Sequence, residues 1–323
     1  MSGISVIIPL YNKQDTIVRA LESVLQQRNA EVEAIIVDDG STDLSLDRLQ
    51  RYRGKFSLLS QSNSGPSAAR NAGVKSARYD LFAFLDGDDE LDPEFASAHL
   101  RLREKKSNVD ISFNSFRISE DKQADKIEKL FDRKFAADNV LVAEEGEFYL
   151  LKEFDKSVSI NIASNAFAVN RQLFESTRGF DERLKRLEIS DALANFLLHS
   201  KPESIGVVNS TLSTVWRSEA NSQFARTEGD IRQSKIYCMN VLKYIDKLPE
   251  HSRKPYFQQL ENWCAQLLSR RRYISFVKLY SRIRTIPHFE RYFAMSRKGK
   301  LVYLCLSPVV SLLPIDKSLE SIA

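Results

Sequence analysis

The sequence predicts an α/β protein, a three-layer α/β/α sandwich in which helices cover both faces of a mostly parallel central sheet. Three observations favour this class. Short β-branched or apolar runs alternate with helix-period segments over the first 115 residues. The run Leu81–Leu85 is almost wholly apolar, which is typical of a strand buried on both faces. Acidic clusters follow two of the runs, at Asp38–Asp43 and Asp86–Asp89, where an open parallel sheet binds its ligands.

Each expected element has a local signal. Apolar runs predict strands at Ser5–Pro9, Val32–Val37, Phe56–Ser60, Leu81–Leu85, Val109–Phe113 and Ser164–Val169. Helical spacing predicts helices over 17–25, Asp43–Arg53, Pro66–Arg78 and Arg186–His199, the first with Asp15 as its N-cap. The polar segment Ser119–Lys134 is expected to be an exposed loop or a surface helix. Repeated β–α units of this kind predict parallel strands joined by right-handed crossovers.

The strand pattern stops near Ser218, and Ile231–Leu313 has the pattern of several helices. We therefore expect one α/β domain over residues 1–225 and a C-terminal helical appendage over residues 226–323. No turn-rich linker separates the two parts, so the second part is not expected to be an independent domain.

Composition limits the class of protein. The 323 residues are 43% hydrophobic and 28% charged, as in an ordinary soluble globular protein. Cys238, Cys264 and Cys305 lie far apart without metal-ligand spacing, which predicts reduced, buried thiols and no disulfide. The N-terminus lacks the basic and apolar regions of a secretory signal, so we expect a cytoplasmic protein.

Charge is distributed unevenly along the chain. Residues 1–100 carry 10 Lys and Arg against 15 Asp and Glu, a balance of −5, whereas residues 251–300 carry 12 against 2, a balance of +10. A basic block can bind nucleic acid, but this one lacks a recognisable nucleic-acid module, so no nucleic-acid partner is expected.

A charge-free apolar stretch of 15 residues, Leu301–Ile315, follows the basic block and is interrupted by Pro308. A membrane-spanning helix needs about 20 apolar residues, so an interfacial anchor at an anionic membrane surface fits better. The basic residues that would face the headgroups are Arg291, Arg297, Lys298 and Lys300. The alternative is a C-terminal helix that docks on the α/β domain.

Several catalytic classes lack their motifs. The first strand ends Pro9-Leu10-Tyr11-Asn12 without the Gly-x-Gly-x-x-Gly of a dinucleotide-binding enzyme. The chain also has no P-loop, no Gly-x-Ser-x-Gly elbow and no histidines at metal-ligand spacing. Hydride transfer and nucleophilic hydrolysis are therefore disfavoured.

The segment Asp86-Gly87-Asp88 predicts a metal site. Crowded carboxylates repel one another unless a cation or hydrogen-bond donors hold them. On an extended segment, a spacing of two puts both side chains on one side, and Gly87 would let the chain turn at the sheet edge. Oxygen ligands suit Mn²⁺ or Mg²⁺ bound jointly with substrate phosphates. The alternative is a surface turn rich in Asp and Gly.

Four segments in order resemble the family 2 glycosyltransferases, which have the GT-A fold: Ser5–Asn12, Val37–Asp43, Asn63–Gly73 and Phe84–Asp89. The resemblance is strong over residues 1–115 and weak over 160–225. It implies inverting, metal-dependent transfer of a sugar from a nucleotide-diphosphate sugar to an acceptor hydroxyl. Residues 1–115 would form the nucleotide-sugar half and residues 116–225 the acceptor half.

The resemblance also implies roles for single residues on the nucleoside side. Pro9, Tyr11, Asp38 and Asp39 would surround the nucleoside, with Asp39 accepting a hydrogen bond from the base. For Tyr11, packing against the sheet edge is the alternative to stacking on the base.

On the diphosphate side, the resemblance places Arg70 near the donor and Asp86 at the metal and the ribose–diphosphate, with Asp88 as the direct metal ligand. A guanidinium suits phosphate or sugar oxygens. The alternative for Arg70 is an ion pair on the surface of its helix.

The general base is expected near residue 188. The segment Arg178–Glu182 resembles the one that precedes a Glu-Asp pair in the family, but here the pair is replaced by Glu188-Ile189. Asp191 lies two residues later, about 200° round a helix. We favour Asp191 over Glu188 as the base, with loss of the base as the alternative. Glu219 stands where the family often has a histidine.

The resulting hypothesis is an enzyme of surface polysaccharide assembly (capsule, O-antigen or exopolysaccharide), peripheral at the inner face of the cytoplasmic membrane. A UDP-sugar is the favoured donor and a glycan or lipid-linked glycan the acceptor. One alternative, motivated by Ile189, is a non-catalytic nucleotide-sugar-binding or scaffold protein. A nucleotidyltransferase is another, but it would have a Gly-rich basic loop where this chain has Pro9–Lys13.

Overall fold

The computed structural model of the chain describes residues 2–120, 123–128, 140–144, 147–151, 163–184, 188–217, 240–242, 245, 254–269, 273–286, 289 and 303. The chain divides into two compact units, Met1–Ala225 and Arg226–Ala323. Each unit is described by itself below.

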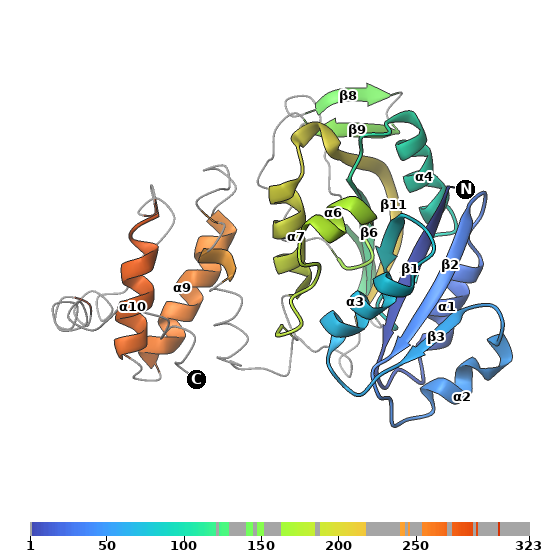
Figure 1. Cartoon of the computed structure of the whole chain (residues 1–323), viewed down its shortest axis with the longest axis horizontal. Coiled ribbons are helices and arrows are strands. Elements are labelled where there is room, and N and C mark those ends of the chain that lie inside the picture. Colours follow the sequence, from blue (N-terminus) through green and yellow to red (C-terminus); the bar gives the residue numbers. More distant parts are fainter. Residues whose placement is uncertain are drawn as a thin grey trace. The chain divides into compact units, whose positions relative to one another are not determined.

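The first unit is built on one sheet (Figure 1). Its strand order is β3 (Ser57–Ser60), β2 (Glu31–Asp38), β1 (Gly3–Leu10), β4 (Leu81–Phe84), β10 (Phe167–Asn170), β6 (Ile111–Glu120), β11 (Ile205–Arg217), β9 (Phe148–Leu151) and β8 (Val140–Glu144). Two further strands lie off this path: β5 (Glu90–Leu91) pairs with β11, and β7 (Gln123–Glu128) pairs with β6.

Most of these strands share one direction. β3, β2, β1 and β4 pair in parallel, as the β–α repeats predict. β10 runs antiparallel to both of its neighbours, β4 and β6. β6 therefore regains the direction of β4, and β11 pairs with it in parallel. The α/β class with a largely parallel sheet is confirmed. The sheet is mixed, because β10, β9, β7 and β5 pair antiparallel with their neighbours.

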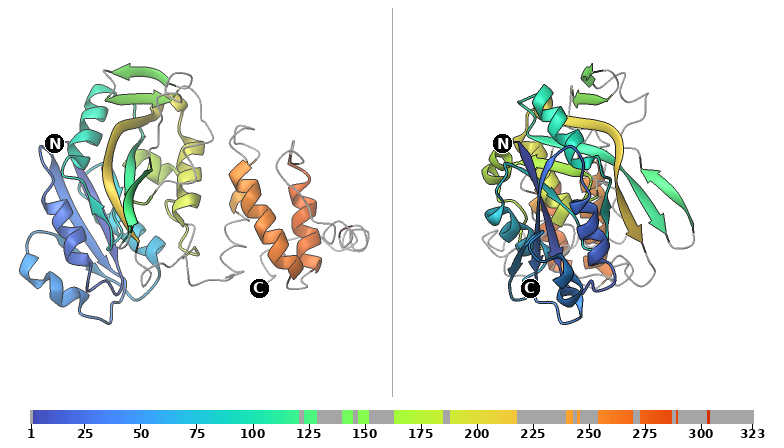
Figure 2. Two further views of the ribbon diagram at one scale, coloured as in Figure 1. Left: turned by 180° about the vertical axis from the view of Figure 1, so that it is seen from behind. Right: turned by 90° about the vertical axis from the view of Figure 1, so that its right-hand side faces the viewer.

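Two hydrophobic cores lie on opposite faces of the sheet. Successive residues of a strand point to opposite faces, so Ile7 of β1 joins one core and Val6 and Ile8 join the other. The Ile7 core includes residues of α3 (Pro66–Ser76), α6 (Arg171–Ser176) and α7 (Glu188–His199). The other core includes residues of α1 (Ile17–Leu25), α2 (Ser45–Leu49) and α4 (Phe95–Lys105). The helices thus form a layer on each face (Figures 1 and 2).

Gly73 shows how closely α3 approaches the sheet. A Cβ atom at this position would lie 2.4 Å from Cγ2 of Ile7 on β1. Glycine is therefore required for close contact between α3 and β1, and this contact sets the depth at which the start of α3 lies over the sheet.

Three local expectations differ from the structure, two of them in kind and one only in the bounds of a helix. The N-cap of α1 is Thr16 and not Asp15, and its side chain makes no capping hydrogen bond. The expected helix over Asp43–Arg53 is shorter and ends in a 3₁₀ turn, Gln50–Tyr52. The described residues of Ser119–Lys134 form the end of β6 and β7 instead of a loop or a helix. Just before them, Phe116 and Ile118 are buried on either side of exposed Arg117, which is the alternation of a strand.

The described part of the second unit is helical. α9 (Lys254–Ser269) contributes Leu260 and Cys264 to its buried residues, and α10 (Tyr273–Ile283) contributes Phe276. Burial raises the pKa of the Cys264 thiol above its ordinary value, which favours the inert, protonated form.

None of the helices in the described part of the chain is long and apolar enough to cross a membrane. The predicted anchor lies outside the described residues, apart from Tyr303. Residues outside that part include Cys238, Cys305, Glu219, Arg291, Arg297, Lys298, Lys300 and Pro308.

Candidate functional site

The site is built at the carboxyl ends of β1, β2 and β4. The turns that follow β1 and β2 are bonded to each other: the amide of Thr42 donates to Oδ1 of Asn12 across 2.8 Å, and the amide of Lys13 donates to Oγ of Ser45 across 2.8 Å. Asn12 has a φ of 52°, in the left-handed region that Asn tolerates better than most residues. These contacts fix where the chain leaves β1.

Asp38 ends β2 and Asp39 follows it, and both are buried. Asp38 accepts a hydrogen bond from the amide of Ser41 at 3.0 Å. Asp39 accepts from the amides of Ser64 and Gly65 at 2.7 and 2.8 Å, and from Nε2 of Gln61 at 2.8 Å. Its carboxylate therefore holds the segment that leads into α3 against the end of β2.

The other two predicted nucleoside residues lie next to this pair. Pro9 lies opposite Val37 in the β1–β2 register, and Val37 directly precedes Asp38. Tyr11 follows β1 directly, and 47% of its surface is exposed. An exposed aromatic ring beside the ends of two parallel strands is available to stack on a base.

Residues Asp86–Asp89 form a tight turn, in which the amide of Asp89 donates to the carbonyl oxygen of Asp86 at 3.0 Å. The extended geometry expected for this segment is wrong. The chain must reverse here because only residues 85–89 separate β4 from β5. The carboxylates of Asp86 and Asp88 therefore contact different partners.

Asp86 contacts Arg70 and Ser164. Nη2 of Arg70 donates to it at 2.6 Å, and Oγ of Ser164 donates at 2.9 Å. Burial raises the pKa of Asp86, but the charge of Arg70 and these hydrogen bonds outweigh that effect and hold it below the ordinary value. Asp86 is therefore ionised and fixed in place.

Arg70 links two parts of the site. Its side chain is 2% exposed, and Nη1 donates to Oε1 of Glu188 on α7 at 3.2 Å. The guanidinium carbon lies 5.4 Å from the ring centroid of Phe180. Burial lowers the pKa of Arg70, but the charges of Asp86 and Glu188 raise it above its ordinary value. Arg70 is thus a buried bridge and not a surface ion pair.

Two basic side chains that the sequence reasoning missed, Lys13 and Arg19, contact Asp88. Nζ of Lys13 contacts its carboxylate, and Nη2 of Arg19 donates to its carbonyl oxygen at 2.6 Å. Arg19 also pairs with Glu90 at 2.7 Å and lies 4.4 Å from the ring centroid of Trp216. The available signal for Lys13 was its position in the turn after β1, three residues beyond the end of the strand.

Asp89 is the buried member of the turn. It accepts from the amide of Trp216 at 3.0 Å, and Asn165 contacts it at 3.4 Å. Burial, followed by the charges of Asp86 and Asp88, raises the pKa of Asp89 well above its ordinary value, which favours its neutral form. The adjacent polar pair Ser164 and Asn165, which precedes β10, was the sequence signal for these contacts.

The carboxylates fit a metal that is shared with a ligand. Among the described residues, no group of three or more His, Cys, Asp or Glu side chains is placed to hold a metal alone. Asp88 is 19% exposed and already holds a cation, the ammonium of Lys13. A divalent ion at Asp88 would need further oxygen ligands, which a diphosphate supplies.

The two predicted base residues have different surroundings. Glu188 is 13% exposed and lies beside Arg70, so the structure brings it together with Asp86. Asp191 is fully buried, and its carboxylate lies 3.9 Å from Nη2 of Arg178. Ile189, between them, packs against the Ile7 core.

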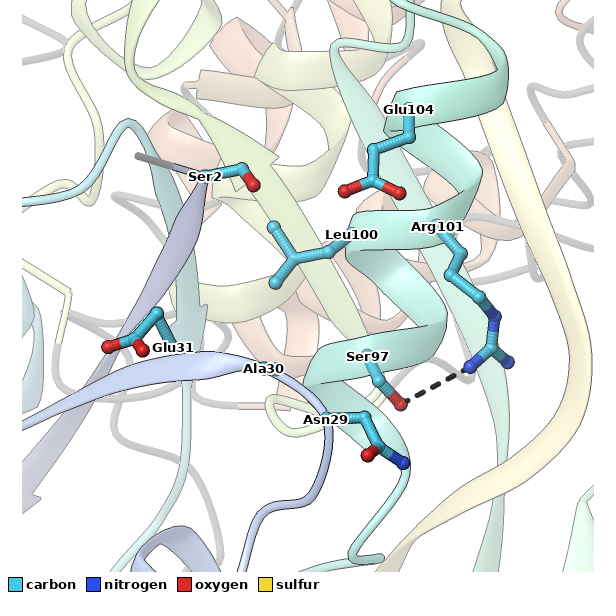
Figure 3. A pocket seen from close by; sticks show the side chains of 8 residues that line it. All are labelled: Ser2, Asn29, Ala30, Glu31, Ser97, Leu100, Arg101 and Glu104. Carbon is cyan, nitrogen blue, oxygen red and sulfur yellow. Dashed lines mark hydrogen bonds between the residues drawn. The ribbon is translucent and has the colours of Figure 1, made fainter.

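A separate hollow of about 340 Å³ lies away from these residues. Figure 3 shows that Ser2, before β1, Glu31, at the start of β2, and Arg101 of α4 line it. Ser2 and Glu31 lie at the amino ends of β1 and β2, opposite to the acidic turns, so this hollow is not part of the site.

A family model, "Glycosyl transferase family 2", matches residues 5–177 of the chain. Similar curated proteins include an uncharacterized glycosyltransferase of Haemophilus influenzae, 27% identical over 240 residues, which cover 65% of this chain and 92% of that protein. The succinoglycan biosynthesis protein ExoO of Rhizobium meliloti is 30% identical over 195 residues, which cover 56% of this chain and 52% of ExoO.

Other curated relatives match over a shorter length. YibD of Escherichia coli is an uncharacterized glycosyltransferase, 43% identical over 93 residues, which cover 28% of this chain and 27% of YibD. For EpsH of Bacillus subtilis, the matched segment covers 30% of the relative. The chain thus spans less than a third of the length of these two relatives.

The fold is similar to that of solved structures of S. aureus TarS. TarS 1–349 in complex with UDP-GlcNAc superposes with a TM-score of 0.63 at 18% identity, over 96% of this chain and 88% of that one. A second structure of TarS 1–349 contains UDP, with a TM-score of 0.59. At this level of identity, the likeness concerns the fold.

Proposed function

The chain belongs to glycosyl transferase family 2, and on this premise we propose that it transfers a sugar from a nucleotide-diphosphate sugar to an acceptor hydroxyl, with inversion and with a divalent cation. The observation that carries the proposal is the meeting of three elements at one sheet edge. The Asp38–Asp39 end of β2, the Asp86–Asp89 turn after β4 and Glu188 at the start of α7 are linked through Arg70 and the segment before α3.

The nucleoside would lie against the ends of β1 and β2. Tyr11 offers an exposed ring for the base. Asp39 supports this site by holding the segment before α3, since all three described hydrogen bonds of its carboxylate come from residues 61–65. A base that binds Asp39 directly would share an oxygen that already accepts from the protein, which a carboxylate can do because each oxygen has two lone pairs.

The cation would be held by Asp88, with Mn²⁺ or Mg²⁺ as the ion. The metal, when bound, neutralises charge that develops on the departing diphosphate. Asp86 is already bonded to Arg70 and Ser164, so its role is to orient the turn and to add negative charge next to the ion. Arg70 acts in this proposal through Asp86 and Glu188, because both of its terminal nitrogens are bonded to them.

Proton removal from the acceptor requires a carboxylate within hydrogen-bond reach of that hydroxyl. The contacts of the two candidates favour Glu188, which is partly exposed beside the donor cluster, over fully buried Asp191. This reverses the preference for Asp191 that was stated from the sequence. Ile189 is apolar and cannot accept the proton.

The finer identity of the substrates is also part of the proposal. TarS, whose fold is similar, was solved with UDP and UDP-GlcNAc, which supports a UDP-sugar donor. ExoO is named for succinoglycan biosynthesis, which supports a glycan or lipid-linked glycan acceptor in polysaccharide assembly.

A thermal-shift panel tests the proposal. UDP-, GDP-, dTDP- and CMP-sugars are compared with and without Mn²⁺. A ligand at 100 times its Kd stabilises the folded state by about 2.7 kcal/mol, which corresponds to a rise in Tm of roughly 5 °C. We expect that rise for a UDP-sugar with Mn²⁺. Absence of any shift across the whole panel would reject nucleotide-sugar binding.

A further inference from the structure

Lys13 joins the turn after β1 to the acidic turn after β4. Its Nζ contacts the carboxylate of Asp88, and the two side chains are 21% and 19% exposed. Both backbone polar groups of Lys13 are hydrogen-bonded. Its amide donates to Ser45, and its carbonyl oxygen accepts from the amide of Ile17, at the start of α1, at 2.9 Å. The ammonium therefore reaches Asp88 from a rigid base.

The stem of Lys13 lies beside Gly87. A Cβ atom at Gly87 would lie 3.4 Å from Cγ and 3.6 Å from Cβ of Lys13. The methylene chain of Lys13 thus runs along the turn at the residue between Asp86 and Asp88. Because its methylene chain runs along the turn, the ammonium of Lys13 stays beside the turn even when it no longer contacts Asp88.

The two cations that contact carboxylates of the turn differ in burial and in the number of their carboxylate partners. Arg70 is 2% exposed, and its two terminal nitrogens contact two carboxylates on different elements. Lys13 is partly exposed and contacts Asp88 through one point charge on a flexible stem. Of these two cations, Lys13 is the one that can leave its carboxylate without unfolding its surroundings.

We propose that Lys13 is an exchangeable counter-ion. In the free protein its ammonium pairs with Asp88, and when a divalent cation binds Asp88 instead, the ammonium pairs with the donor diphosphate. This inference rests on the proposed function. A metal that binds Asp88 must displace the ammonium of Lys13, so in the absence of a diphosphate Lys13 lowers the affinity for the metal. A diphosphate offers the displaced ammonium new acceptor oxygens, so the two ligands favour each other's binding.

The test compares Lys13→Met with the wild type. Mn²⁺ affinity is measured by electron paramagnetic resonance, with and without UDP, and UDP affinity by calorimetry, with and without Mn²⁺. The matched control is Lys75→Met, which removes an exposed lysine from the last turn of α3. Lys13→Gln serves as a second variant with a polar side chain.

We expect Lys13→Met to bind Mn²⁺ alone about tenfold more tightly and UDP about tenfold more weakly, so that the coupling between the two ligands falls. Lys13→Gln should behave alike, and Lys75→Met should match the wild type. If wild-type protein binds UDP with Mn²⁺ but Lys13→Met leaves UDP affinity unchanged, counter-ion exchange is overturned while the proposed function stands. If wild-type protein binds no UDP with Mn²⁺, the proposed function itself fails.

Discussion

Arg70 and Glu188, 118 positions apart in the sequence, are joined by a hydrogen bond of 3.2 Å. Because Arg70 also donates to Asp86, a single buried guanidinium sets the first turn of α7 in register with the acidic turn after β4. The spacing between the proposed base and the proposed metal site therefore depends on one side chain of α3.

Replacing Arg70 with Met should destabilise the fold. Removing one partner of a buried ionic contact leaves an uncompensated charge, and we expect the free energy of unfolding to fall by about 3 kcal/mol. Chemical denaturation measures it. The control is Arg101→Met, which removes an exposed pair with Glu147 at 2.8 Å and should cost less than about 1 kcal/mol. Equal effects of the two substitutions would contradict the role of Arg70 as a bridge.

Asp88→Asn should abolish the metal dependence of donor binding. Asn keeps the size of the side chain but removes the charge that a divalent cation requires. The ratio of UDP Kd values without and with Mn²⁺, measured by calorimetry, should fall to about one. Asp47→Asn, on an exposed position of α2, is the control and should keep the wild-type ratio. If the ratio in Asp88→Asn equals that of the wild type, Asp88 is not the metal ligand.

The base assignment is tested by two amide variants. Glu188→Gln keeps an oxygen for Arg70 but cannot take a proton, so kcat should fall by about 10²-fold or more with little change in KM. Asp191→Asn should reduce kcat by less than about tenfold, because its carboxylate is buried beside Arg178. A larger loss in Asp191→Asn would assign the base to Asp191 instead.

His99 should make the fold sensitive to acid. Its Nδ1 lies 2.7 Å from Oγ of Ser112, its Nε2 lies 3.1 Å from Oδ1 of Asn114, and burial lowers the pKa of His99 to about 4 from 6.5. Between these values the unfolded chain binds a proton that the folded chain does not. Stability present above pH 6.5 is therefore lost as the pH falls, by up to about 1.4 kcal/mol per pH unit.

His99→Gln removes this titration. Its free energy of unfolding, measured from pH 7 to pH 4.5, should decline less steeply than that of the wild type. His199→Gln, at the exposed end of α7, should keep the wild-type slope. If the free energy of unfolding falls equally steeply with pH in the wild type and in His99→Gln, His99 is not the cause of the loss of stability in acid.

The predicted C-terminal anchor can be tested by deletion. Removal of residues 296–323 should release the protein from vesicles that contain anionic lipid, because each basic residue near such a surface contributes about 1 kcal/mol. Sedimentation with vesicles measures the bound fraction, and vesicles of neutral lipid are the control. Unchanged sedimentation with anionic vesicles would assign the apolar stretch to packing within the protein.

The sequence predicted the elements whose signals are local. β1, β2 and β4 each contain an apolar run, and the acidic residues after β2 and β4 were visible without a structure because a strand's end and its following residues are neighbours in the chain. β10 was expected as a strand, but its antiparallel position between β4 and β6 was not, since strand order depends on crossovers that periodicity does not encode.

The contacts of the site were hidden for the same reason. Lys13 and Asp88 are 75 positions apart, and Ser164 and Asp86 are 78 apart. No local pattern pairs such residues. β11 was missed because register shifts around Thr211 interrupt its alternation of apolar and polar residues. The turn at Asp86–Asp89 replaced the expected extended segment because β5 begins immediately after it.

The pairing of β5 with β11 has a further consequence. Residues 85–89 are closed at one end by β4 and at the other by β5, where Leu91 lies opposite Ser213, and the amide of Trp216 holds Asp89. A short loop that is fastened at both ends has little conformational entropy left to lose when a ligand binds. β11 is separated from β1 by β4, β10 and β6 in the strand order. Sequence changes along β11 should nevertheless alter the affinity for the proposed nucleotide-sugar donor.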